Sequence, residues 1–292
     1  MSSPASSGRV RALLLALSSG AIVFLIAQAV WGAVLWKLYT HPAGWELGAM
    51  ATFLVCGIAW LRFGPWPLFG RAFRREGLRF NRVRLAAFLP ALVAGWSTMI
   101  AGFCLYAAHR AASGLGGESP VTLPAQAHGA WLFAGLLMSG SVAGVVEEIA
   151  FRGFMQGILE KRFPAAAAIV VTGFFWGLVH LNHAYFGEET FLWFGVFLAV
   201  AAILGTIAHR TNSVLPGIVV HAGFDSTYFL VAGLLQPRIA PLAFVQSLAA
   251  PSTLRIVAAC AVVVAAVAWR AFFASTRSRP KNIAVMARRR GP

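Results

Sequence analysis

Charged side chains are scarce in this chain, and acidic ones are the scarcest. Only 11% of its 292 residues are charged, nine are acidic, and Asp225 is the single aspartate. Because a soluble domain carries about 25% charged residues, this deficit excludes an ordinary water-soluble domain and indicates an integral membrane protein. The three cysteines, Cys56, Cys104 and Cys260, all lie within apolar runs. Neither a disulfide framework nor a zinc knuckle is therefore expected.

Apolar residues fill most of the chain. They make up 59% of it, and the mean hydropathy is +0.74. A transmembrane helix needs about 20 mostly apolar residues, and the candidate spans lie near residues 13–36, 46–63, 85–108, 131–151, 165–183, 190–208, 214–235 and 254–273. The first is interpreted as a span rather than a signal peptide, because its apolar run continues through Trp36. We therefore expect an all-α fold, a polytopic transmembrane helix bundle of about eight spans.

The basic residues set the expected orientation of this bundle. The net charge is +15, but lysine and arginine lie between apolar runs rather than on one basic face, so no nucleic-acid partner is expected. With both termini inside, the outer segments hold only four of the 24 basic residues, Lys37, Arg110, Arg238 and Arg255. Because cytoplasmic loops carry the excess of lysine and arginine, both termini are expected in the cytoplasm, and the membrane is the cytoplasmic one if the source is bacterial. The basic loops need no role beyond topology and contact with anionic lipid.

Two adjacent glutamates, Glu147 and Glu148, end the fourth apolar run. A charge at membrane depth costs at least about 2.5 kcal/mol, so such residues usually have a function. Glu148 and Arg152 are four residues apart with the acid first, which is the favourable order for a helical ion pair. Such a pair leaves Glu147 as the freer carboxylate on another face of the helix. The alternative is that both glutamates merely pair with basic residues at a helix end.

His180 lies in the fifth apolar run, and its distance from a turn relates it to Glu147. Proline suits the first turn of a helix, so Phe163–Pro164 is the expected turn between two antiparallel helices. Glu147 and His180 are equidistant from that turn, each about 24 Å along its helix. They should therefore lie at one depth, provided that the first helix continues past Arg152. Alternatively, His180 is only a packing residue.

The seventh run contains His221 and Asp225, which are four residues apart and so lie on one helix face. The alternative is a buried pair that only holds helices together. If this helix begins at Ser213, His221 lies nearer the inner side than Glu147, a mismatch that tilt or a kink at Pro216 could close. Four other polar residues are weaker candidates for a functional role. Asn182 and His183 are expected at the outer boundary of the membrane, and Glu188 and Glu189 in a solvated loop.

These motifs resemble the CAAX-processing and bacteriocin-processing (CPBP) family of intramembrane proteases, which includes the type II CAAX prenyl endopeptidases. The family pattern is EExxxR, FxxxH and HxxxN or HxxxD, in that order. Trp176 stands where phenylalanine is usual, which keeps an aromatic ring and is expected to change little. Asp225 stands where several members have asparagine. An asparagine amide can donate a hydrogen bond to an oxyanion, whereas an ionised aspartate cannot. Asp225 is therefore expected to be protonated, to orient His221 or to help bind a metal. The expected division is spans 1–3 in residues 1–129, a catalytic core in 130–235, and span 8 with a basic tail in 236–292.

The resemblance implies an endopeptidase that hydrolyses a peptide bond of a membrane-associated or prenylated substrate. Glu147 is expected to be the general base, assisted by His180, while His221 with Asp225 stabilises the oxyanion or orients the group that does. Glu148 and Arg152 are expected to hold the shape of the site. A metal-free mechanism is favoured, although Glu147, His180 and His221 could hold zinc. The alternative is a non-proteolytic membrane carrier or scaffold that uses the buried acids for protons or cations.

Overall fold

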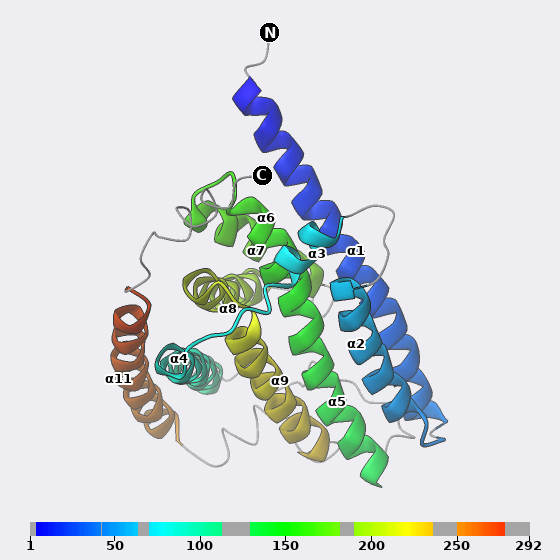
Figure 1. Ribbon diagram of the computed structural model, residues 1–292. Helices are drawn as coiled ribbons and strands as arrows, with labels where there is room; N and C mark the ends of the chain where they lie inside the picture. The colour runs from blue at the N-terminus through cyan, green and yellow to red at the C-terminus, as the bar shows by residue number, and fades with distance from the viewer. Residues whose placement is uncertain are drawn as a thin grey trace.

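The computed structural model describes residues 4–41, 43–63, 70–112, 129–181, 190–235 and 250–277. Within these ranges the chain is helical and contains no strand, which confirms the all-α expectation. The helices are splayed rather than parallel, because α4 and α8 are seen nearly end-on where α1, α2 and α5 lie close to the plane of the view (Figure 1). Their bounds are α1 Pro4–Thr40, α2 Glu46–Phe63, α3 Arg71–Leu78, α4 Leu85–Ala112, α5 Gly129–Glu147, the π-helix η1 Glu148–Met155, α6 Gln156–Leu159, α7 Ala165–His180, α8 Thr190–Thr211, α9 Leu215–Leu235 and α11 Pro251–Thr276.

Each of the expected spans corresponds to a helix. In the described part of the chain six segments are long and apolar enough to cross a membrane, and α7 is a shorter apolar helix of 16 residues. Many large apolar side chains point outward, including Leu14, Val55 and Val267, each more than 60% exposed. So many exposed apolar side chains suit contact with lipid rather than with water. The polytopic membrane bundle is thus confirmed, while the count of eight and the orientation stay predictions.

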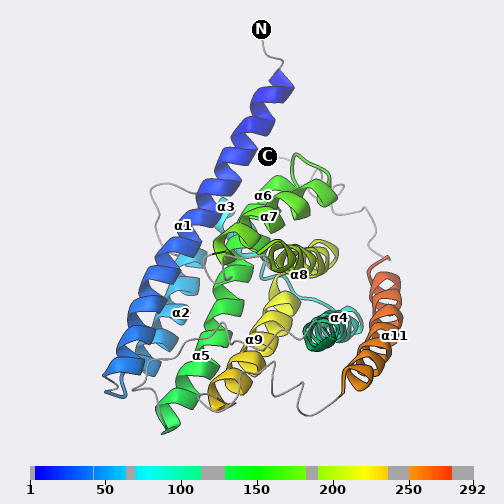
Figure 2. The ribbon, with the colours of Figure 1, turned by 180° about the vertical axis from the view of Figure 1, so that it is seen from behind.

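Close packing of α5 against α9 brings two motifs together. In both views α5 lies between α1 and α9 (Figures 1 and 2). A Cβ atom on Gly140 would lie 2.2 Å from the backbone nitrogen of Ser226, and one on Gly144 would lie 2.4 Å from that of Ala222. Small residues four apart let membrane helices approach backbone to backbone. Glu147, which ends α5, and Glu148, which follows it, therefore reach the first turns of α9.

The helix that carries the glutamates changes its winding at the motif. It continues past Glu147 as the π-helix η1, all of whose residues are buried, and then as α6 to Leu159. A π-helix bonds i to i+5 and often marks a functional site. The chain then turns, and α7 begins directly after Pro164. The expected continuation past Arg152 and the expected proline turn are both confirmed, but the change in winding was not foreseen.

Arg79 corrects the interpretation of the basic loops. Its side chain is 4% exposed, and its guanidinium donates hydrogen bonds to the carbonyl oxygens of Arg152, at 3.1 Å, and Ala208, at 3.0 Å. A second residue of this segment, Arg74, is 2% exposed. The five donors of arginine suit it to carbonyls left open near helix ends. A role limited to topology and lipid contact is therefore wrong for these two arginines.

Glu160 completes this cluster in the turn after α6. Its carboxylate lies 3.2 Å from Arg79 Nη2 and 3.2 Å from His209 Nδ1, and it accepts a hydrogen bond from Gln156 at 2.7 Å. Burial raises the pKa of Glu160, but the hydrogen bond from His209, the charge of Arg79 and the Gln156 amide together lower it below its ordinary value. The cluster thus joins the segment after α3 to the helices that carry the motifs.

Candidate active site

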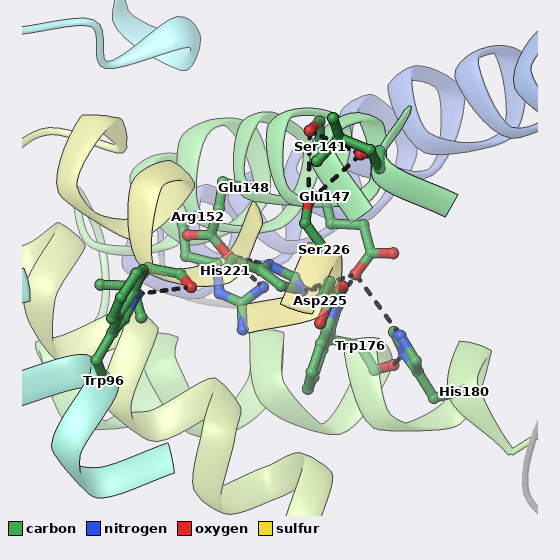
Figure 3. Close-up of polar contacts among 12 residues, drawn as sticks. Trp96, Ser141, Glu147, Glu148, Arg152, Trp176, His180, His221, Asp225 and Ser226 are labelled. Atoms are coloured by element: carbon green, nitrogen blue, oxygen red, sulfur yellow. Dashed lines mark hydrogen bonds and ion pairs between the residues drawn. The ribbon is translucent and has the colours of Figure 1, made fainter. Parts of the chain in front are cut away.

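The residues of the three motifs converge in one buried cluster. Glu147 ends α5, Glu148 and Arg152 lie in η1, Trp176 and His180 lie in the last turns of α7, and His221 and Asp225 lie in α9. Figure 3 shows their side chains pointing toward one another between these helices. The site is therefore assembled from helices that are distant in the sequence.

Glu147 faces both histidines. Its Oε2 atom lies 3.6 Å from His180 Nε2 and 3.9 Å from His221 Nε2. The same oxygen accepts a hydrogen bond from the indole Nε1 of Trp176 at 2.6 Å. The Glu147 side chain is 8% exposed. The two partners in the hairpin thus meet, as their equal distance from the Phe163–Pro164 turn predicted.

The backbone fixes the ring of His180. Its Nδ1 atom lies 2.7 Å from the carbonyl oxygen of Trp176, one turn earlier in α7. A carbonyl can only accept, so Nδ1 is the donor and Nε2 is the nitrogen that faces Glu147. The His180 side chain is 18% exposed, more than that of Glu147. His180 therefore lies on the more accessible side of the pair.

Glu148 belongs to a separate, fully buried triad. Its Oε1 atom lies 3.0 Å from Arg152 Nη1 and 3.1 Å from His221 Nδ1. The side chains of Glu148 and Arg152 are 0% and 1% exposed. Such a pair is stable only when its charges remain matched. The adjacent glutamates thus have different partners, as the i, i+4 spacing of Glu148 and Arg152 predicted.

His221 lies between two carboxylates. Its Nδ1 atom faces Glu148, and its Nε2 atom lies 3.3 Å from Asp225 Oδ2. The depth mismatch disappears because α9 begins near Arg152 rather than near the α6–α7 turn. Arg79 links the start of α9 to Arg152. Its carbonyl accepts the N–H of Val214 at 3.1 Å, and its guanidinium donates to the Arg152 carbonyl. His221 thereby reaches the level of both glutamates.

In the described arrangement His221 is not oriented as a zinc ligand. A zinc-bound histidine offers a nitrogen lone pair to the metal, but both ring nitrogens of His221 face carboxylate oxygens and are placed to donate to them. Among the residues that the structure describes, no group of three or more His, Cys, Asp or Glu side chains is arranged to hold a metal ion.

Trp176 contributes more to the cluster than its aromatic ring. Its N–H group bonds Glu147, which phenylalanine could not do. The signal was present in the sequence, because Trp176 and His180 are four residues apart and share a helix face. The four weaker candidates, Asn182, His183, Glu188 and Glu189, lie outside the described residues.

The fold and the cluster define the class, a polytopic helical membrane protein with a buried site of acids and histidines. Residues 129–227 of the chain match the family model described as type II CAAX prenyl endopeptidase Rce1-like. The matched segment contains all seven residues of the cluster, and the match confirms the resemblance to the CAAX-protease-like family that the motifs indicated. Searches of the curated proteins and of the solved structures each found no match.

Proposed function

We propose that the chain is an intramembrane endopeptidase in which Glu147 and His180 activate a water molecule for attack on a peptide bond. One observation carries the proposal. Glu147 Oε2 and His180 Nε2 lie 3.6 Å apart inside an apolar bundle, too far for a good direct hydrogen bond but suited to a water held by both. A general base must lie within hydrogen-bond reach of the proton that it abstracts, directly or through one water. Glu147 takes the proton of this water and delivers it to the leaving amine.

The remaining members of the cluster have supporting roles in this proposal. The Nε2 atom of His221 faces the same carboxylate oxygen from α9, at 3.9 Å, and is the nitrogen of this ring best placed for the developing oxyanion. Asp225 orients His221 through the contact at 3.3 Å, which is the second of the three roles considered for it. Glu148 and Arg152 keep His221 and η1 in place through charge matching inside the bundle.

The substrate that fits this proposal is a membrane-associated protein or peptide. The site is built into apolar helices, so a substrate must partition into the bilayer to reach it. Prenylation is one way to achieve this, and the matched family is described by it. If the source is bacterial, the cytoplasmic membrane is the proposed location.

The test uses the purified full chain in liposomes with three probes. These are a farnesylated CAAX peptide, the same peptide without the lipid, and a library of membrane-spanning peptides whose fluorescence is quenched until they are cleaved. Each is tested with and without a zinc chelator. We expect cleavage of at least one lipid-anchored or membrane-spanning probe, unaffected by the chelator and lost in Glu147→Gln. Glu76→Gln is the matched control, because Glu76 pairs with Lys161 on the exposed surface. Failure to cleave any probe, or equal cleavage by Glu147→Gln, would favour the carrier or scaffold alternative.

A further inference from the structure

Trp176 is in contact with four members of the cluster, Glu147, Arg152, His180 and His221. It is 3% exposed, and its indole N–H donates to Glu147 at 2.6 Å. The Arg152 guanidinium lies over its ring, 4.7 Å from the centroid. The centroid of the His180 ring lies 4.3 Å from that of Trp176, and the His221 ring lies at 5.8 Å, edge to face. Figure 3 shows the indole beneath the carboxylates, between the two histidines.

The indole N–H performs a task that a phenyl ring could not. A hydrogen bond to an ionised acceptor is shorter and about twice as strong as a neutral one, and burial strengthens it further. This bond engages Oε2, the same oxygen that faces Nε2 of His180. It therefore holds the Glu147 carboxylate in the orientation needed to share a water with His180. The Arg152 guanidinium over the indole ring adds a cation–π contact that fixes the position of the ring.

The charge of Asp225 explains why Glu147 needs the donor that Trp176 supplies. Asparagine at position 225 would be neutral, whereas Asp225 adds a third carboxylate to a site that already holds Glu147 and Glu148. Asp225 Oδ2 and Glu147 Oε2 approach the same nitrogen, His221 Nε2, at 3.3 and 3.9 Å. Carboxylates that approach one nitrogen in this way compete for it and repel each other. The hydrogen bond from Trp176 holds Glu147 Oε2 in place against that competition.

We propose that Trp176 is a positioning residue whose indole N–H holds the Glu147 carboxylate in its orientation toward His180 beside the neighbouring Asp225, so that Trp176 and Asp225 act as a complementary pair. The inference rests on the proposed function, since the consequence is expressed in cleavage. Trp176→Phe keeps an aromatic ring and removes the N–H group. Asp225→Asn removes the charge that makes this N–H necessary. The effects of the two substitutions should therefore not be additive.

The kinetic test compares Trp176→Phe, Asp225→Asn and the double variant. A hydrogen bond to a charged group is lost in Trp176→Phe, so kcat should fall about 10- to 100-fold with KM within about twofold of wild type. In the Asp225→Asn background the same change should cost less than about threefold. Trp269→Phe is the matched control, because it also removes an indole hydrogen bond. Trp269 lies on α11, and its N–H group donates to Thr98 of α4 at 3.0 Å. Equal losses in both backgrounds, or a Trp176→Phe rate near wild type, would overturn the inference.

A spectroscopic test does not depend on cleavage. The chain has ten tryptophans, and a two-dimensional spectrum of the indole N–H groups in the wild type should contain one strongly downfield resonance. It should be absent from Trp176→Phe and move upfield in Glu147→Gln, which keeps the indole but removes the charge. If no resonance moves in Glu147→Gln, the inference fails even if the protein is a protease. If the resonance moves but no probe is cleaved, the hydrogen bond stands and the proposed function fails.

Discussion

Glu148→Gln should destabilise the protein strongly, because Glu148 neutralises two buried partners at once. The carboxylate lies 3.0 Å from Arg152 and 3.1 Å from His221, and neither side chain of the ion pair is more than 1% exposed. Glutamine keeps the volume but leaves Arg152 without a counter-charge. Breaking one side of a buried pair costs about 3–5 kcal/mol, which by the scaling of soluble domains is a fall in melting temperature of about 6–20 °C.

The assay is thermal unfolding in detergent, with two companions. Glu148→Gln combined with Arg152→Gln should recover a clear part of the loss, because no lone charge remains. Glu76→Gln should change the melting temperature little, because the Glu76 and Lys161 side chains are 60% and 50% exposed and such pairs contribute about 0–1 kcal/mol. If Glu148→Gln melts together with Glu76→Gln, Glu148 does not neutralise a buried charge and the assignment of different roles to the two glutamates is refuted.

Three further outcomes are expected. Gly144→Leu should prevent close packing of α5 on α9 and abolish folding. Gly102→Leu should be tolerated, because nothing lies within 4 Å of a Cβ atom there. Equal expression of the two variants would contradict this packing. Because the pKa of Glu160 is lowered, its stabilisation is present above the unfolded value of about 4.5 and is lost as pH falls further, so the melting difference between wild type and Glu160→Gln should shrink below that pH and is contradicted if it grows. A reporter fused after Arg84 should read cytoplasmic and one after Glu118 external, and a cytoplasmic reading at Glu118 would refute the predicted orientation.

The parts of the fold that follow local rules could be predicted from the sequence. Apolar runs of span length located the helices, and Pro164 set the turn that places Glu147 opposite His180. Spacing of four residues paired Glu148 with Arg152 and His221 with Asp225, because such residues share a helix face. These predictions needed no knowledge of which helices pack together.

The parts that depend on contacts between distant segments could not be predicted. Nothing in the residues of η1 distinguishes i→i+5 from i→i+4 bonding, so the π-helix was missed. Counting loop charges treated Arg79 as a topology signal, although it binds carbonyls 73 and 129 residues away. Trp176 was considered for its ring alone, because its N–H matters only once α7 lies against Glu147.

The central claim is that Glu147 and His180 act on one water molecule, and a double-mutant cycle on the cleavage rate tests it most directly. The assay compares kcat for wild type, Glu147→Gln, His180→Gln and the double variant, all shown to be folded by their melting temperatures. A general base supplies about 10²–10⁴-fold, so Glu147→Gln should lose at least about 100-fold. Residues that act as a unit are not additive, so the double variant should be no slower than Glu147→Gln alone. Near wild-type cleavage by Glu147→Gln, or losses that multiply in the double variant, would contradict the account.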